Sequence, residues 1–103
     1  MSFKEITVRG TAYERGFTYG KLCKEEIDIS IRGYARLYKD TKGVSWEDAR
    51  KISEYYLSLV RDFEPDYAEE MRGIADGAGV DLLDIVDVIE ISQQLAQLAA
   101  VFL

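Results

Sequence analysis

The chain has 103 residues, of which 48% are hydrophobic and 31% charged, with a net charge of −6. This composition is typical of one globular domain. The chain contains no histidine, which excludes the usual proton acceptor of nucleophilic catalysis. Its one cysteine, Cys23, excludes an internal disulfide and a cysteine-rich metal site.

The charge is unevenly distributed along the chain. Residues 1–63 hold 12 basic and 10 acidic side chains, whereas residues 64–103 hold one basic and nine acidic ones, a net charge of −8. A protein that binds nucleic acid needs basic clusters, so we expect no such partner. No apolar run approaches the length of a membrane span, and the N-terminus lacks the apolar core of a signal peptide. We therefore expect no membrane partner and a cytoplasmic location.

Residues 3–9 have the alternating pattern of a short β-strand. Ile6 and Val8 would point to one face, and Thr7 and Arg9 to the other. A lone strand cannot satisfy its own backbone hydrogen bonds, so this segment needs partner strands that the rest of the chain does not obviously supply.

A helix is predicted over about residues 12–40. Thr11 and Glu14 form a capping box at its start. Gly16 and Gly20 lie inside it, where each costs about 1 kcal/mol relative to alanine, so they need a structural reason. Close backbone packing against another element is favoured over space for a ligand. Cys23 is predicted to be a small buried apolar residue.

The next helix is predicted over residues 46–63. Gly43 favours an end to the preceding helix, and Ser45 with Asp48 favours a new start. We interpret its apolar positions as a core-facing stripe rather than a binding site, at the following residues: Trp46, Ala49, Ile52, Tyr56, Leu59, Val60 and Phe63.

The segment Pro65 to Asp84 holds the only proline and two helix starts. Pro65 fits the first turn of a helix over residues 66–77, and either Gly77 or Gly79 is expected to end it in a left-handed cap. Asp81 starts the following helix. The expected apolar face of the first helix consists of Tyr67, Met71, Ile74, Ala75 and Ala78.

The last predicted helix covers residues 82–102. Apolar residues recur along it at spacings of three and four, which indicates a heptad seam over about two heptads. An uncovered seam of this kind predicts an interaction surface. The candidate partner interface consists of Val88, Ile91, Leu95, Leu98 and Phe102.

Two segments of the sequence resemble a known family. The family pattern P-x-Y-x-E-E-[MI]-x-G-I-A-x-G-A, followed by D-I-[LV], matches residues 65–78 and 84–86. A second pattern, G-x-x-Y-E-x-G-x-x-[HY]-G, matches residues 10–20. On these motifs the chain resembles the acyl-coenzyme A:6-aminopenicillanic acid acyltransferase (isopenicillin N acyltransferase) family of N-terminal-nucleophile hydrolases, and the resemblance covers about residues 5–87.

The resemblance implies a fold and a partner. It implies one domain, residues 1–103, that is mostly α with one short N-terminal strand and about four helices. Such a domain would be the helical α subunit of an αββα enzyme, packed on a β subunit that begins with cysteine after the precursor cuts itself following Leu103. The resemblance also suggests that Gly16 and Gly20 pack on the main enzyme body. After Val86 the chain departs from the family, with Ile89 and Ile91 near the usual asparagine and arginine positions, so no substrate contact is transferred.

The leading hypothesis is therefore the α subunit, or processed pro-segment, of a self-processing acyltransferase or amide hydrolase. Within this chain we identify no nucleophile–base pair, and we assign no catalytic residue, no cofactor and no metal ligand. The alternative is a stand-alone helical module without catalytic activity that self-associates through the 82–102 helix. A third alternative, a small-molecule pocket among Tyr13, Tyr19, Tyr34 and Tyr38, is disfavoured because tyrosines mostly supply amphipathic packing at domain surfaces.

Overall fold

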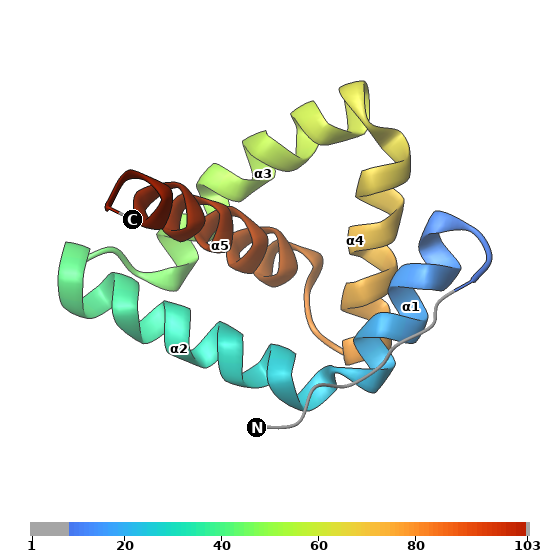
Figure 1. The fold of residues 1–103 in the computed structure, drawn as a ribbon, viewed down its shortest axis with the longest axis horizontal. Helices are drawn as coiled ribbons and strands as arrows, with labels where there is room; N and C mark the ends of the chain where they lie inside the picture. The colour runs from blue at the N-terminus through green and yellow to red at the C-terminus, as the bar shows by residue number, and fades with distance from the viewer. Residues whose placement is uncertain (1–8, 103) are drawn as a thin grey trace.

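The computed structural model describes residues 9–102, and these residues form five α-helices (Figure 1). The mostly helical class is thereby confirmed. The strand expected over residues 3–9 lies outside the described residues, apart from Arg9, which is not in a strand. The helices are α1 (Ala12–Leu22), α2 (Lys24–Lys42), α3 (Trp46–Phe63), α4 (Pro65–Ala78) and α5 (Leu82–Phe102).

The helices form an open frame with one helix inside it. Figure 1 shows α2, α3 and α4 as three sides of a triangle, with α1 beside α4 and α5 running within the frame. The apolar core lies where α3, α4 and α5 meet, and Met71 and Val86 are fully buried there. The buried core cluster consists of Leu57, Ala68, Met71, Ala75, Ile85 and Val86.

Helices α1 and α4 approach each other through four glycines. A Cβ atom added at Gly16 or Gly20 would lie closer than 3.0 Å to a carbonyl oxygen of α4, and one added at Gly73 or Gly77 would lie equally close to a carbonyl oxygen of α1. The contacts advance in the same direction along both helices, so the pair is parallel. Close backbone packing at Gly16 and Gly20 is thus confirmed, but the expectation that their partner is the main enzyme body is wrong, because they pack on α4.

The single helix predicted over residues 12–40 is also wrong, because the chain bends at Cys23. This residue has φ −108° and ψ 20°, between the end of α1 and the start of α2. No glycine or proline marks the bend. Its cause is tertiary: α1 is held along α4, whereas α2 must turn away to reach α5.

Caps fix the helix ends. The Thr11 side chain accepts a hydrogen bond from the Glu14 backbone N–H, and the Ser45 side chain does the same for Asp48. Gly43 and Gly79 adopt left-handed conformations that end α2 and α4, with φ angles of 65° and 70°. Of the two glycines considered for the end of α4, Gly79 is therefore the cap.

The buried face of α3 agrees with the predicted stripe only in part. Ala49 of the stripe is buried, and Tyr56 and Val60 pack against the core. The structure also buries Ser53 and Leu57, which are not in the stripe, while the stripe residues Ile52, Leu59 and Phe63 are exposed. The reason is a buried polar contact: the Ser53 hydroxyl donates a hydrogen bond to Asp87 of α5. This contact rotates α3 so that Ser53 and Leu57 face inward, which apolar periodicity alone does not anticipate.

The glycine contact leads to a stability prediction. Gly16→Ala forces a methyl group into the Glu70 carbonyl, so we expect the free energy of unfolding to fall by at least about 1–3 kcal/mol. Gly33→Ala is the matched control, because Gly33 is also in a helix interior and a Cβ there meets nothing within 4 Å. We expect Gly33→Ala to raise stability by about 0.5–1 kcal/mol. Urea denaturation of both variants tests the contrast, and equal effects would contradict it.

Candidate functional site

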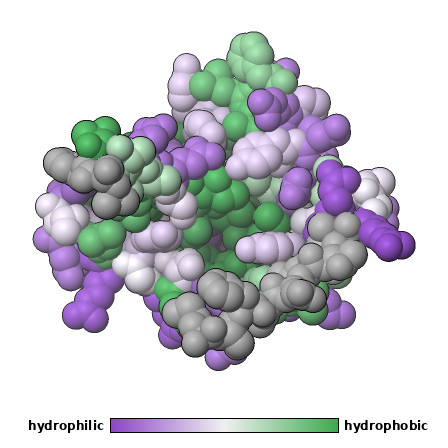
Figure 2. Space-filling view, in the orientation of Figure 1, coloured by the Kyte–Doolittle hydropathy of each residue, from purple (hydrophilic) through white to green (hydrophobic). Residues whose placement is uncertain are grey.

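An apolar groove opens on one face of the domain. It has a volume of about 540 Å³ and lies among α1, the start of α2, α4 and α5. Figure 2 shows hydrophobic residues gathered in the centre of this face, with hydrophilic ones around them. The residues that line the groove are Tyr19, Cys23, Glu26, Ile27, Ser30, Ile74, Ile85, Val88, Ile89, Ser92, Gln93 and Ala96.

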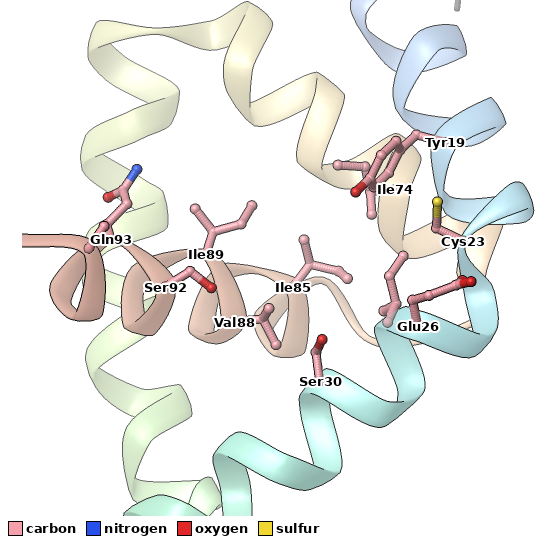
Figure 3. Close-up of a pocket in the computed structure, with 12 residues that line it drawn as sticks. Tyr19, Cys23, Glu26, Ser30, Ile74, Ile85, Val88, Ile89, Ser92 and Gln93 are labelled. Carbon is pink, nitrogen blue, oxygen red and sulfur yellow. The ribbon is translucent and has the colours of Figure 1, made fainter. Parts of the chain in front are cut away.

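The floor and walls of the groove come from different helices (Figure 3). Ile85, Val88 and Ile89 project from α5 on one side, and Tyr19 of α1 and Ile74 of α4 lie on the other. These positions follow from the bend at Cys23, which separates the α1 wall from the α2 wall. Apolar side chains predominate, so the groove suits an apolar occupant.

The reactive groups of the groove are arranged for packing rather than for nucleophilic attack. Cys23 is 7% exposed, and its thiol forms a hydrogen bond with the Tyr19 hydroxyl. Partial burial, followed by the interaction with Cys23, raises the pKa of Tyr19 above its ordinary value of 10.0. The Tyr19 hydroxyl therefore stays protonated at neutral pH and cannot take a proton from the thiol. The predicted burial of Cys23 is confirmed.

A second polar cluster lies inside the domain, between α3 and α5. Ser53 and Asp87 are both buried, and the Ser53 hydroxyl donates to Asp87 Oδ1. Glu90 Oε2 lies 3.3 Å from the same hydroxyl. Asp87 Oδ2 is buried and has no hydrogen-bond partner among the described residues.

The environment of Asp87 changes its acidity. Burial raises the pKa of Asp87 from 3.8 to about 6; the Ser53 hydrogen bond opposes this change, and the nearby charges of Glu90 and Asp84 add to it. Because the folded protein binds this proton more tightly than the unfolded chain, ionisation of Asp87 destabilises the fold.

The five predicted interface residues do not share one environment. Val88 is half-buried and lines the groove, Ile91 is buried within the domain, and Leu95 is exposed. The side chains of Leu98 and Phe102 lie outside the described residues. The predicted seam is thus divided between the core and the surface, and its role in binding a partner stays a prediction.

The four tyrosines considered as a pocket serve separate contacts. Tyr13 donates to Asp76 of α4 over 2.6 Å, and Tyr34 pairs with Ser92 of α5 over 3.2 Å. Tyr38 donates a hydrogen bond to Gln94 over 3.3 Å, whereas Tyr19 lines the groove.

The described residues include no cluster of three or more acidic or thiol side chains that could hold a metal ion. Within residues 9–102, no helix has the length and apolar character required to cross a bilayer.

Sequence reasoning missed the Ser53–Asp87 pair and most of the groove. The sequence held a signal for the pair, since Asp87 interrupts the apolar run from Ile85 to Ile89. Its neighbours along the helix, Ile85 and Val86, are buried. The groove had no such signal, because it depends on the bend at Cys23.

The chain is similar over most of its length to a known hydrolase. Over 83 residues, 74% of this chain, the sequence is 38% identical to beta-alanyl-dopamine/carcinine hydrolase from Drosophila melanogaster. The chain is a distant, partial homologue of this hydrolase. It spans 20% of the length of that relative. No family model matches the chain.

The acidity of Asp87 predicts how the stability of this hydrolase homologue depends on pH. Asp87 stabilises the fold fully when protonated, below about pH 4, and this contribution is lost as pH rises to about 6. Asp87→Asn keeps the size and an acceptor for Ser53 but cannot ionise. We expect it to be more stable than the parent at pH 7, by at most about 3 kcal/mol, and nearly equal to it near pH 4.

Urea denaturation across this pH range measures the difference. Asp40→Asn is the matched control, because Asp40 is exposed on α2. A loss of stability in Asp87→Asn at pH 7 would contradict the assignment of a raised pKa.

Proposed function

We propose that this chain is the non-catalytic helical part of an amide hydrolase or acyltransferase, corresponding to the α subunit of a self-processing enzyme. Its function is to pack on the catalytic β subunit and to shape the approach to its active site. The observation that carries the proposal is the 38% identity to one fifth of a hydrolase.

The structural role of the motifs supports the proposal. The two segments that resemble the family are residues 10–20 and 65–86, which include most of α1 and all of α4. Gly16 and Gly20 of the first segment contact the α4 backbone, and Gly73 and Gly77 of the second contact the α1 backbone. These motif residues hold the two helices together, as expected for a part whose contribution to the enzyme is structural.

The proposed reaction uses a nucleophile outside this chain. The thiol of a cysteine at the N-terminus of the β subunit attacks the amide carbonyl, and the α-amino group of the same cysteine takes the thiol proton. The C–N bond breaks and the amine leaves with a proton, which gives a thioester acyl-enzyme. Water then attacks the thioester and releases the acid; if another amine attacks instead, the acyl group is transferred. The relative is named as a hydrolase of beta-alanyl-dopamine and carcinine, and we extend only the cleavage of an amide bond to this chain.

The apolar groove supports the docking of a further part of the enzyme. A groove of about 540 Å³ with an apolar lining is costly to leave in water. Covering it with the β subunit removes that cost and places α2 and α5 at the boundary between the two parts.

The direct test is mass spectrometry of the complex purified from its native source with an antibody to this chain. We expect a second polypeptide in equal amount whose N-terminal residue is cysteine. If the chain is recovered without any associated catalytic polypeptide, the proposal is overturned. Self-association through the 82–102 helix in that preparation would instead support a stand-alone module.

A mutational test separates the two thiols of the proposed enzyme. Cys23→Ala removes a buried thiol that has no catalytic role, so we expect the assembled enzyme to keep its amide-cleaving activity. Replacing the N-terminal cysteine of the β subunit by alanine should abolish activity. Activity assays with an acyl-amine substrate measure both variants. A loss of activity in Cys23→Ala, with assembly intact, would contradict the placement of the nucleophile outside this chain.

A further inference from the structure

The outer face of α3 carries a row of exposed large apolar side chains. They follow one another at spacings of three, four and four, so they lie on one side of the helix. We name this row the α3 stripe; its members and their exposed fractions are Ile52 (63%), Tyr55 (71%), Leu59 (39%) and Phe63 (80%).

We propose that the α3 stripe binds the α3 stripe of a second copy of this chain, with the two helices antiparallel about a two-fold axis. In such a pair the axis passes between Tyr55 and Leu59. Ile52 of one copy then lies opposite Phe63 of the other, and Tyr55 lies opposite Leu59. Every apolar member of the stripe thus meets an apolar member of the second copy.

The charges beside the stripe fit this arrangement. Lys51 and Asp62 lie on the same edge of the stripe, the edge away from the domain core. In the antiparallel pair Lys51 of one copy faces Asp62 of the other, and the two-fold axis makes this contact twice. Lys51 is 3.7 Å from Asp48 on its own helix and has an exposed side chain, whereas Asp62 forms no ion pair with any described residue.

The same charges disfavour a parallel pair. A parallel two-fold pair would bring opposite edges of the two stripes together, so Lys51 and Asp62 of one copy would face neither residue of the other copy, and the attraction between them would be lost. The opposite charges of Lys51 and Asp62 therefore meet only in the antiparallel pair, which agrees with a second copy as the partner and sets the direction of its helix.

The shape of the surface beside the stripe agrees with the pairing. A hollow of about 480 Å³ lies next to the C-terminal half of α3, and Leu59 and Phe63 are among the residues that line it. In the antiparallel pair this hollow lies near Ile52 of the second copy, whose exposed side chain can enter it.

This inference does not depend on the proposed function. None of the four residues of the α3 stripe lines the apolar groove among α1, α2, α4 and α5. The α3 pair joins two copies of this chain, whereas the proposed β subunit covers the groove. A failure of one contact would leave the other unaffected.

Charge reversal tests the pair, because the side chains of Lys51 and Asp62 are exposed and their replacement leaves the fold intact. We expect the full chain to form a dimer in light scattering coupled to size exclusion. Lys51→Asp alone and Asp62→Lys alone should each weaken dimerisation at least about tenfold, since each breaks two symmetric ion pairs. The double variant, Lys51→Asp with Asp62→Lys, should restore the dimer.

Two further variants complete the test. Glu54→Lys is the matched control for Asp62→Lys, because it also replaces an acidic side chain of α3 by lysine. Glu54 lies two residues after Ile52, on the side of the helix turned away from the stripe. Glu54→Lys should leave dimerisation unchanged. Phe63→Ser should weaken dimerisation without loss of helical content, which circular dichroism measures.

Three outcomes would overturn the proposal. One is a chain that stays monomeric at every concentration tested. Another is a dimer, or a larger assembly, that both single charge reversals leave unchanged, which would point to another surface such as the predicted seam at residues 88–102. The third is protection of the α3 stripe in the native complex by a different polypeptide without a second copy of this chain.

Discussion

The contact on which the rest of the structure depends is the backbone-to-backbone approach of α1 and α4. Gly16 and Gly20 are the buried residues of α1, so this helix contributes little apolar side-chain area to the core. It is held instead by the close approach of its backbone, which favours dispersion and weak Cα–H···O contacts. Contacts at the edge of the pair add to this: Tyr13 donates to Asp76, and the Arg72 guanidinium lies 4.4 Å from the centre of the Tyr13 ring. Any side chain larger than hydrogen at the glycines would separate the two helices.

The position of α1 determines where the groove forms. Because α1 is fixed along α4, the chain must bend at Cys23 before α2 can reach α5. Lys24, the first residue of α2, donates from its ammonium group to the Ala78 carbonyl at the end of α4, over 2.6 Å. This bond ties the start of α2 to the end of α4 at the corner of the frame. The α1 and α2 walls of the groove therefore diverge from one point, and α5 supplies the remaining wall.

Much of the helical framework could be predicted from the sequence because its signals are local. Thr11, Ser45 and Gly43 each mark a helix end through a hydrogen bond or a backbone angle formed within a few residues. The bend at Cys23 could not be predicted in this way, since it results from contacts with helices that lie far away in the sequence. The rotation of α3 escaped prediction for a similar reason: apolar periodicity favoured Ile52 and Phe63 for the core, whereas the buried partner of Ser53 is an aspartate on another helix. The groove depends on the bend, so its lining was missed with it.

The glycines that carry part of the resemblance to acyltransferases therefore act in helix packing rather than in catalysis. Glycines are chemically inert, and one helix contact explains four of the glycines in the family motifs, namely Gly16, Gly20, Gly73 and Gly77. This contact lies within the two matched segments, before the sequence departs from the family after Val86. Asp87 illustrates the difference, because it lies just beyond the matched motif and forms a buried polar contact with Ser53, a residue outside both motifs. The part of the chain that resembles the family thus explains how α1 and α4 pack together, whereas the polar contact between α3 and α5 depends on residues outside it.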